Sequence, residues 1–354
     1  MASRRQSEMS SRYSNRVLWI DAARGLAIFL VILGHTVQFG SQGKFDFFSN
    51  PLFIFIYSFH MPLFVFLSGF VSAHGIYASD QKHFLRRRFE QLMIPMINWS
   101  LVGGMATWLA LALLSRSFDF LRLLHIELGA FKPYNSLWFL WCIFFINVIV
   151  ALVRRASIRY RSLILILLVP IIWILPHSIG FQLQWLYPFF VAGVLISRVK
   201  ELSRRYETAC VLLASAMFVA LIALWQRNYS VYIQGMSLLN DDLYQTCALW
   251  IYRYSLAAIA ILSVLGGVRA LSQKFRVYPL IKLGQFSLGI YCLQTFIFRV
   301  IQVIPSPSAN QSLYFGVYVP IVACLVTVIC YSAVNRISSR GRKARRYFLG
   351  EKPA

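Results

Sequence analysis

Two residue types that serve anion binding and acid–base chemistry lie on one face of the first apolar segment of this chain. In the run DAARGLAIFLVILGHT, Arg24 precedes His35 by eleven positions. Eleven steps of about 100° return an α-helix to within roughly 20° of the same face, and a rise of about 1.5 Å per residue separates the two by roughly 16 Å along the axis. Asp21 falls near the same face. Because ionisable groups in a membrane helix are costly unless they face a polar cavity, these three residues predict a functional site.

Each of the three residues also has a structural interpretation. A neutral imidazole takes a proton from a hydroxyl near neutral pH, so His35 is a candidate general base, but a lone histidine can equally hydrogen-bond a neighbouring helix. Arg24 can neutralise a phosphate or carboxylate at the inner mouth of a cavity, or pair with Asp21 three residues before it. Both can hold for Arg24, with Asp21 keeping it in place. The shared face of all three favours function.

A second histidine lies in the next apolar segment, in the run SFHMPLFVFLSGF. Pro62 frees a backbone carbonyl and is expected to kink this helix beside His60. His60 either lines the cavity or is a structural residue of the kink, and the two interpretations have equal weight. The small pair Ser68-Gly69 predicts the close approach of another helix, and Ser68 is a further candidate for the cavity lining.

The next loop carries a basic triplet, Arg86, Arg87 and Arg88, in the run HFLRRRFEQLMIP. At the membrane surface, such a triplet is typical of the positive charge that any inside loop carries and of contact with lipid headgroups. The functional alternative is a landing site for the phosphates of a nucleotide-bearing donor.

Polar residues in two later apolar segments complete the candidate set. Asn135 precedes the fourth segment and is a possible cavity residue, whereas Trp138 is also typical of an interfacial anchor. Ser287 and Tyr291 are one helical turn apart, and Gln294 continues the same face. These three residues either line the interior of a bundle or serve helix packing.

Several common catalytic signatures are absent from the sequence. It contains no Walker loop, no His-Glu-x-x-His motif and no nucleophile elbow. The six cysteines show no metal or redox spacing. We therefore expect no metal site, no disulfide and no bound cofactor.

The composition is that of a polytopic membrane protein. Of 354 residues, 58% are apolar and 16% aromatic, and the mean hydropathy is +0.63. This pattern predicts an all-α fold that spans a membrane several times. The net charge of +23 comes from short loops between apolar segments, without a basic stripe or a known binding motif, so nucleic-acid binding is excluded as the main function.

Ten segments are apolar enough to span a membrane, and the fourth to sixth have the least certain limits. The predicted spans are 17–39, 51–75, 92–115, 137–153, 162–177, 181–197, 208–226, 248–268, 280–302 and 313–334. With the N-terminus inside, 27 Lys and Arg residues fall in inside segments and 5 in outside loops, when Lys282 at the inner end of the ninth span is counted as inside. This asymmetry predicts both termini in the cytoplasm.

One membrane domain, 17–334, lies between basic cytoplasmic tails at 1–16 and 335–354. The basic N-terminus followed by an apolar run is reminiscent of a secretory signal. That run is long, contains Asp21 and Arg24 and lacks an evident small-x-small cleavage site. We interpret it as a retained first membrane helix.

The runs quoted above resemble those of the membrane-bound acyltransferase-3 family. DAARGLAIFLVILGHT has that family's Arg-x10-His motif, and SFHMPLFVFLSGF is similar to its second-helix signature, with FHMPLF leaning toward the fucose 4-O-acetylase-like subgroup. LWFLWCIFF and LGQFSLGIYCLQ are similar to its fourth-helix and late-helix patterns. The resemblance covers essentially the whole chain and implies transfer of an acyl group, usually acetyl from acetyl-CoA, to a sugar hydroxyl.

By motif position, the resemblance implies that His35 is the catalytic histidine, that Arg24 is its paired arginine and that Arg86 to Arg88 form the donor-side loop. The chain departs from the family in two places. Many relatives have a further basic residue shortly before the proline at 95, where Gln91 and Leu92 stand here. Many also end the late-helix motif in histidine, where this chain has Gln294. The second departure weakens a role for that residue as a proton carrier.

The sequence therefore predicts an integral-membrane O-acyltransferase, with acetyl-CoA as co-substrate and a cell-envelope or exported glycan or glycolipid as acceptor. His35 is expected to act as a general base or to carry the acyl group covalently. The alternative from another class is an exporter that uses the same cavity without bond chemistry. A third possibility is an acyltransferase for a small lipid, an antibiotic or another non-glycan acceptor. The family implies residence in the plasma membrane of a bacterium, in contact with membrane lipids.

Overall fold

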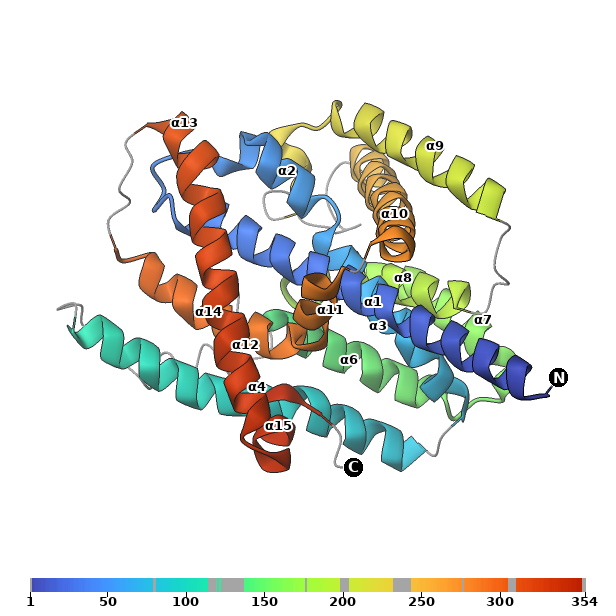
Figure 1. Ribbon diagram of the computed structural model, residues 1–354. Coiled ribbons are helices and arrows are strands. Elements are labelled where there is room, and N and C mark those ends of the chain that lie inside the picture. Colours follow the sequence, from blue (N-terminus) through green and yellow to red (C-terminus); the bar gives the residue numbers. More distant parts are fainter. Residues whose placement is uncertain are drawn as a thin grey trace.

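A computed structural model describes residues 2–78, 81–113, 119, 121, 137–175, 177–197, 204–231, 243–275, 277–304 and 310–351. Within these ranges the regular structure is helical and contains no strand (Figure 1). The α-helices are α1 (Ala2–Phe39), α2 (Pro51–Tyr57), α3 (His60–Ala78), α4 (Gln81–Leu113), α6 (Trp138–Val153), α7 (Ile158–Trp173), α8 (His177–Ile196), α9 (Arg204–Ile222), α10 (Leu243–Lys274), α11 (Tyr278–Gln285), α12 (Ser287–Ile301), α13 (Gln311–Leu313), α14 (Val319–Ser339) and α15 (Arg342–Leu349). Short 3-10 helices η1 (Phe47–Ser49) and η2 (Arg227–Tyr229) and a π-helical turn η3 (Tyr314–Tyr318) join them.

Each of the ten predicted spans coincides with one helix or with a broken pair of helices. Five are long and apolar enough to cross a membrane, and the α11–α12 pair makes a sixth if it is counted as one bent span, within the part of the chain that the structure describes. The qualifying segments are Leu18–Phe39, Pro51–Ala73, His83–Leu113, Tyr244–Lys274 and Gln311–Ser339. The protein is thus an all-α integral membrane protein, while the count of ten stays a prediction.

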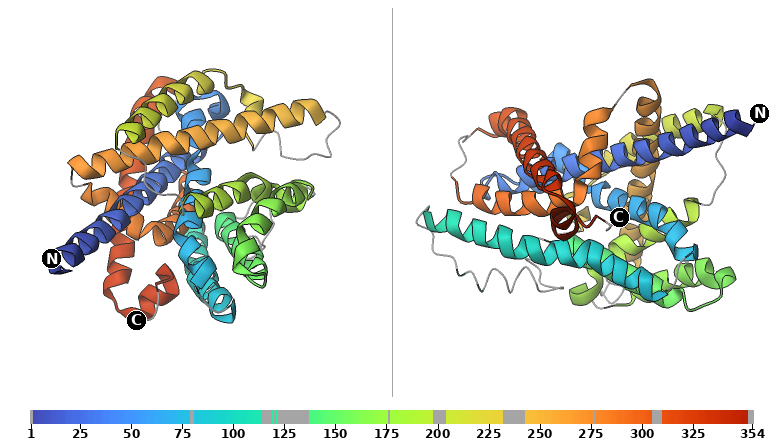
Figure 2. Two further views of the ribbon diagram at one scale, coloured as in Figure 1. Left: turned by 90° about the vertical axis from the view of Figure 1, so that its right-hand side faces the viewer. Right: turned by 60° about the horizontal axis from the view of Figure 1, so that its bottom comes forward.

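The outward faces of the peripheral helices are apolar. Leu212 and Val219 on α9 are 67% and 66% exposed, and Ile251 on α10 is 67% exposed. α9 and α10 pack side by side at the edge of the bundle (Figure 2). Apolar side chains in such positions are costly in water but suited to the hydrocarbon core of a bilayer.

The second predicted span is divided between α2 and α3. α2 begins directly after its N-cap, Asn50. The helical path is interrupted at Ser58 and Phe59. Pro62 explains this position, because it has no N–H group to donate to the carbonyl of Ser58 four residues earlier. α3 starts at His60, so the predicted kink lies beside that histidine.

The ninth predicted span bends sharply where α11 meets α12 at Phe286. The two helix axes differ in direction by 78°. α11 crosses α1 so closely that a Cβ atom added at Gly25 would lie 1.8 Å from the carbonyl oxygen of Leu280. A Cβ atom at Gly284 would lie equally close, at 1.8 Å, to the carbonyl oxygen of Asp21. Only glycine permits this approach, which holds α11 along α1 while α12 turns into the bundle.

A second close crossing joins α3 to α8. A Cβ atom added at Gly69 would lie 2.1 Å from the carbonyl oxygen of Phe190, and one added at Gly193 would lie 2.1 Å from that of Phe66. The close helix approach predicted from Ser68-Gly69 is therefore confirmed at Gly69. This crossing sets the direction of α3, which carries part of the candidate site.

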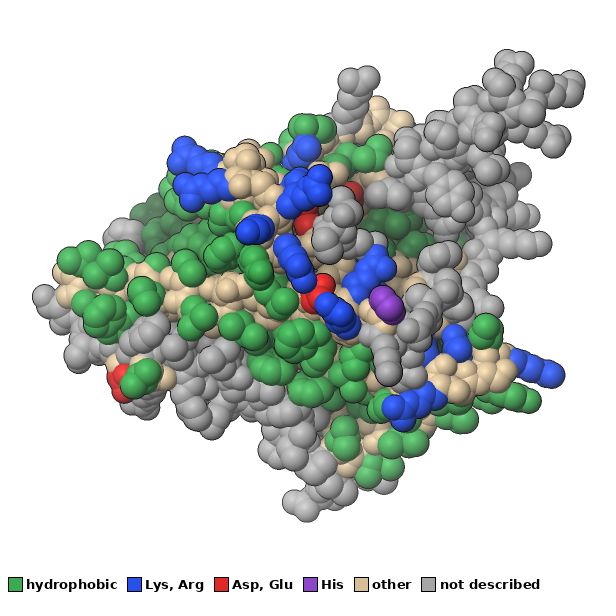
Figure 3. All heavy atoms as spheres, turned by 90° about the horizontal axis from the view of Figure 1, so that it is seen from below, with side chains coloured by type: hydrophobic (Ala, Val, Ile, Leu, Met, Phe, Trp, Pro, Cys, Tyr) green, Lys and Arg blue, Asp and Glu red, His purple; other side chains and the backbone are tan. Residues whose placement is uncertain are grey.

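Segments predicted to lie inside meet one another at one end of the bundle. Arg161 Nη1 donates to the carbonyl of Ile76 at 2.9 Å, and Arg346 pairs with Glu90 at 3.3 Å. α15 packs against α4, where Trp99 Nε1 donates to the carbonyl of Phe348 at 2.9 Å. Viewed from below, Lys and Arg side chains gather beside a wide apolar surface (Figure 3).

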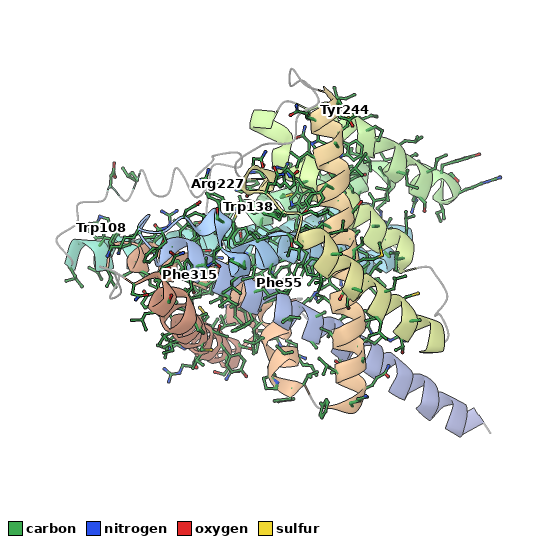
Figure 4. All side chains as sticks on the ribbon, turned by 90° about the horizontal axis from the view of Figure 1, so that it is seen from above. Phe55, Trp108, Trp138, Arg227, Tyr244 and Phe315 are labelled. Atoms are coloured by element: carbon green, nitrogen blue, oxygen red, sulfur yellow. The ribbon has the colours of Figure 1, made fainter. Side chains whose placement is uncertain are left out.

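Segments predicted to lie outside also contact one another. Arg227 in η2 pairs with Asp46 at 3.1 Å, and the side chain of Gln42 donates to the carbonyl of Ile304. Arg227 is marked in the view from above (Figure 4). The contacts at both ends agree with the predicted alternation of loops, and which end faces the cytoplasm stays a prediction.

Candidate active site

A cavity of about 190 Å³ opens between α1, α3, α4, α6 and the first turns of α12. Its polar lining is Arg24, Ser68, Ser72, Arg88, Asn147, Ser287 and Tyr291. Its apolar lining is Met61, Phe64, Val71, Leu92, Phe139, Leu140, Ile143 and Leu288. The lining combines two arginines and several hydrogen-bonding groups with a long apolar wall.

Arg24 is held at the cavity by the crossing of α1 and α11. The preceding turn of α1 carries Asp21, whose carboxylate accepts a hydrogen bond from Gln285 Nε2 at 3.5 Å and attracts Arg24 electrostatically. Asp21 itself lies outside the lining. The arrangement agrees with the structural interpretation of Asp21 as a residue that keeps Arg24 in place, and it leaves Arg24 directed at the cavity.

Arg88 is the member of the basic triplet that reaches the cavity. Its Nη2 donates to Ser72 Oγ at 2.8 Å and its Nη1 to Gln91 Oε1 at 3.3 Å. Arg88 and Arg24 lie close enough to repel each other electrostatically. Two cations that face one cavity are stabilised by an anion placed between them, so this end of the cavity suits a phosphate or carboxylate.

Arg86 and Arg87 lie outside the cavity lining. The Arg86 side chain is 79% exposed and pairs with Glu90 at 3.1 Å, one helical turn along α4. Arg87 is exposed as well. Successive residues of a helix are turned by about 100°, so three consecutive arginines cannot share one face.

His35 is partly buried in the C-terminal half of the apolar stretch of α1. Its Nδ1 lies 2.8 Å from Oε1 of Gln294 on α12. The rings of Phe39 and Phe298 flank the imidazole, with centroids at 5.1 and 5.7 Å. An apolar wall on two sides and an amide partner on a third leave a positioned imidazole whose other nitrogen, Nε2, has no partner recorded among the described residues.

His60 is buried at the first residue of α3 and lies outside the cavity lining. Its Nδ1 donates to the carbonyl of Ile56 at 2.8 Å, across the break between α2 and α3. Its ring meets that of Tyr57 at 4.7 Å, and it interacts electrostatically with His35. The next residue, Met61, does line the cavity. His60 thus belongs to the kink, and neither His60 nor His35 is among the residues that line the cavity.

Of the other candidates from the sequence, Ser68, Ser287 and Tyr291 line the cavity and Trp138 does not. Asn135 lies outside the described residues. Ser287 and Tyr291 enter the cavity because the bend at residue 286 points the first turns of α12 toward it.

Two polar residues of the site were missed as candidates from the sequence. Ser72 lies one helical turn beyond Ser68, so helical spacing could have revealed it. Asn147 is the polar residue at the end of the apolar run FLWCIFFIN. A single amide in an apolar segment could have indicated a residue that faces the interior. Gln294 was predicted to share a face with Ser287 and Tyr291, but its contact with His35 was not predicted, because it joins residues 259 positions apart.

Comparison with known proteins places this site in an enzyme family. A family model described as an acyltransferase domain, Acyl_transf_3, matches residues 17–334. The chain is 28% identical to nodulation protein NolL of Mesorhizobium japonicum over 311 residues, or 82% of this chain and 79% of that protein. It is 29% identical to nodulation protein NolL of Sinorhizobium fredii over 312 residues, or 83% of this chain and 81% of that protein. No solved structure matches the chain significantly.

Since the family model spans most of the sequence, the protein belongs to this acyltransferase family. It is an integral membrane O-acyltransferase, an enzyme that moves an acyl group from a donor to a hydroxyl group. The resemblance identified from the Arg-x10-His motif is thereby confirmed at the level of the family.

Proposed function

We propose that the protein transfers an acetyl group from acetyl-CoA to a hydroxyl group of a cell-envelope or exported glycan, in the plasma membrane of a bacterium. The observation that carries this proposal is the course of the cavity. It begins at Arg24 and Arg88 and follows α3 outward to Met61, beside His60. It also reaches Tyr291, whose carbonyl accepts a hydrogen bond from Gln294, the partner of His35.

The arginine end of the cavity suits the phosphates of CoA. Arg24 and Arg88 supply two guanidinium groups, which bind phosphate bidentately. The first N–H groups of α12, at Ser287 and Leu288, have no acceptor within their own helix and carry the positive end of the helix dipole. The exposed Arg86 and the neighbouring Arg87 add positive charge outside the mouth, where a nucleotide would arrive from the cytoplasm.

The rest of the cavity suits the thioester arm. Its lining on α3 extends from Met61 to Ser72, which corresponds to about 16 Å of helix. That length is comparable to an extended pantetheine arm, and the apolar wall formed by Phe64, Phe139 and Leu140 fits its methylene groups. With the phosphates at Arg24 and Arg88, the thioester carbonyl would reach toward His35.

The hydrogen bonds around Gln294 favour one tautomer of His35. Gln294 Nε2 donates to the carbonyl of Tyr291 at 3.2 Å and to Thr295 Oγ1 at 3.1 Å. A backbone carbonyl only accepts, so this contact assigns the nitrogen of the amide and turns Oε1 toward His35. Nδ1 of His35 then carries the proton, and the lone pair of Nε2 is available as the base.

In the proposed reaction, Nε2 of His35 removes the proton of the acceptor hydroxyl as its oxygen attacks the thioester carbonyl carbon. The tetrahedral intermediate collapses with cleavage of the carbon–sulfur bond. The sulfur leaves as the CoA thiolate and takes the proton back from the imidazolium. An ester and free CoA result, and His35 returns to its neutral form.

The glycan acceptor is supported by the family, and the bacterial membrane is supported by the organisms of the two relatives. Both relatives are nodulation proteins of rhizobia. His35 lies in the half of α1 that is predicted to face the outside, so an acceptor that approaches from there would meet a donor that enters from the inside. Membership of the acyltransferase family argues against the exporter without bond chemistry, and the first experiment tests that alternative directly.

The proposal is tested by incubating membranes with radiolabelled acetyl-CoA and measuring label in the envelope glycan. Wild type, His35→Ala and a control, His83→Ala on the exposed surface of α4, are compared at matched levels of folded protein. We expect label with wild type and the control, and none with His35→Ala. An exporter would neither bind nor consume acetyl-CoA.

Purified protein in nanodiscs, incubated with radiolabelled acetyl-CoA alone, distinguishes the two roles open to His35. Without acceptor, a general base leaves the protein unlabelled, because nothing attacks the thioester. A covalent relay instead transfers the acetyl group to the imidazole and labels the protein itself. We expect no label on the protein.

A further inference from the structure

Asn147 is a buried amide in the wall of the donor cavity. It lies on α6, its side chain is 2% exposed and it lines the cavity together with Phe139, Leu140 and Ile143 of the same helix. These three neighbours are apolar, so Asn147 is the polar group that α6 presents to the cavity. An amide in such a setting needs hydrogen-bond partners, because burying an unpaired polar group costs free energy.

One half of this amide has a partner and the other half has none. Asn147 Nδ2 donates to the carbonyl of Ile143 at 2.7 Å. Because a carbonyl can only accept, this bond assigns the nitrogen and leaves Oδ1 as the other end of the amide. Oδ1 is buried and has no hydrogen-bond partner among the described residues. The cavity wall therefore holds an acceptor that lacks a donor.

Neither serine that α3 contributes to the cavity wall donates to Asn147 Oδ1. Ser68 donates its hydroxyl proton to the carbonyl of Phe64 at 2.9 Å. Ser72 Oγ accepts a hydrogen bond from Arg88 at 2.8 Å. A donor for Asn147 Oδ1 is thus best supplied by a molecule that enters the cavity.

We propose that Asn147 Oδ1 accepts a hydrogen bond from an amide N–H of the pantetheine arm of the acyl donor. This inference rests on the proposed function, because it assumes that the donor is a CoA thioester. A pantetheine arm contains two secondary amides joined by methylene groups, so it alternates N–H donors with apolar stretches. The alternation matches a wall in which one amide interrupts an apolar helix face.

The position of Asn147 along the cavity agrees with this assignment. Asn147 lies eight residues beyond Phe139 on α6, or about 12 Å along the helix. It lies toward the end of α6 that leads into the predicted inside segment 154–161, and that segment contacts α3 near Ile76. Asn147 is therefore nearer the arginine end than Phe139 is, so the amide of the arm would bind between the phosphates and the thioester.

The assignment distinguishes recognition of the arm from recognition of the phosphates. 3′,5′-Adenosine diphosphate carries the 3′- and 5′-phosphates of CoA for Arg24 and Arg88 to bind, but it lacks the second phosphate of the 5′-diphosphate and the pantetheine arm. Asn147→Leu removes the acceptor while keeping the branched shape of the side chain, at a somewhat larger volume. We expect the Kd of CoA to rise about three- to tenfold, as for the loss of one hydrogen bond, and the Kd of 3′,5′-adenosine diphosphate to stay unchanged.

Binding is measured by calorimetry on the full-length protein in nanodiscs, which needs no acceptor and no turnover. Asn98→Leu on α4 is the matched control, because Asn98 makes the same type of bond, from Nδ2 to the carbonyl of Ile94 at 3.0 Å, and lies outside the cavity. It should leave both Kd values unchanged. Asn147→Ala is a second variant for the case in which leucine disturbs packing, and unchanged binding of 3′,5′-adenosine diphosphate reports an intact site in either variant.

Three results overturn the inference. CoA that binds wild type and both Asn147 variants with equal affinity shows that no hydrogen bond to the arm was lost. An equal loss of affinity for CoA and 3′,5′-adenosine diphosphate shows a general disturbance of the cavity. Failure of the wild-type protein to bind CoA rejects the proposed donor, and the inference with it.

Discussion

Alanine at position 25 is expected to separate α1 from α11 and to weaken donor binding. The added Cβ atom would lie 1.8 Å from the carbonyl oxygen of Leu280, whereas ordinary contact begins at 3.4 Å. The two backbones must therefore move apart by about 1.6 Å, and neither has a flexible side chain at the contact that can yield. Overpacking of this kind costs about 1–3 kcal/mol, against which alanine gains about 1 kcal/mol of helix propensity.

The net effect of Gly25→Ala is a loss of stability of up to about 2 kcal/mol. Because Arg24 is the adjacent residue, we also expect the KM for acetyl-CoA to rise. Thermal unfolding of the protein in nanodiscs and acetyl transfer kinetics measure the two effects. Gly267→Ala on α10 is the matched control, since a Cβ atom there has nothing within 4 Å. It should leave stability unchanged or raise it. Equal unfolding temperatures and equal KM values for Gly25→Ala and wild type would refute the reasoning.

Further predictions concern the two ends of the cavity. Arg88→Ala should raise the KM for acetyl-CoA at least about tenfold, as for the loss of one charge-assisted hydrogen bond, while Arg227→Ala on the opposite end leaves this KM unchanged. Arg227→Ala should also change the unfolding free energy by less than about 1 kcal/mol, because its pair with Asp46 is exposed. Gln294→Leu should lower kcat by about 10- to 100-fold with little change in KM, since His35 loses the contact that orients it, and steady-state kinetics check this split. Gln294→Glu should move the acid limb of kcat/KM to higher pH, because a carboxylate beside Nδ1 stabilises the imidazolium, which cannot act as a base. An unmoved pH profile would contradict the assigned role of Gln294.

The features that could be predicted from the sequence depend on local chemistry. The apolar segments are long and are separated by polar loops, so every predicted span coincides with a helix or with a broken run of helices. Pro62 places the break of the second span, because the effect of a proline on a helix reaches only four residues back. The spacing of Arg24 and His35 fixes their common face, and that spacing is a property of the helix alone.

The features that could not be predicted depend on contacts between distant segments. The bend between α11 and α12 accompanies the crossing of Gly25 and Gly284, which no local pattern reveals. The same holds for the partner of His35. Gln294 stands where many relatives have histidine, and its role beside His35 is visible only from the contact between α1 and α12. Arg88 and Arg86 differ only in the face of α4 on which they lie. Predicting that Arg88 lines the cavity therefore requires knowing which face of α4 packs against the bundle.

The central claim is that His35 promotes transfer of acetyl from acetyl-CoA to a glycan hydroxyl. The most direct test incubates purified wild-type protein and His35→Ala with acetyl-CoA that carries a deuterated acetyl group and with the envelope glycan, followed by mass spectrometry of the glycan. The account predicts an ester-linked deuterated acetyl group with wild type and none with His35→Ala. Equal acetylation by both proteins would contradict the role of His35, and no acetylation by folded wild type would contradict the proposed reaction.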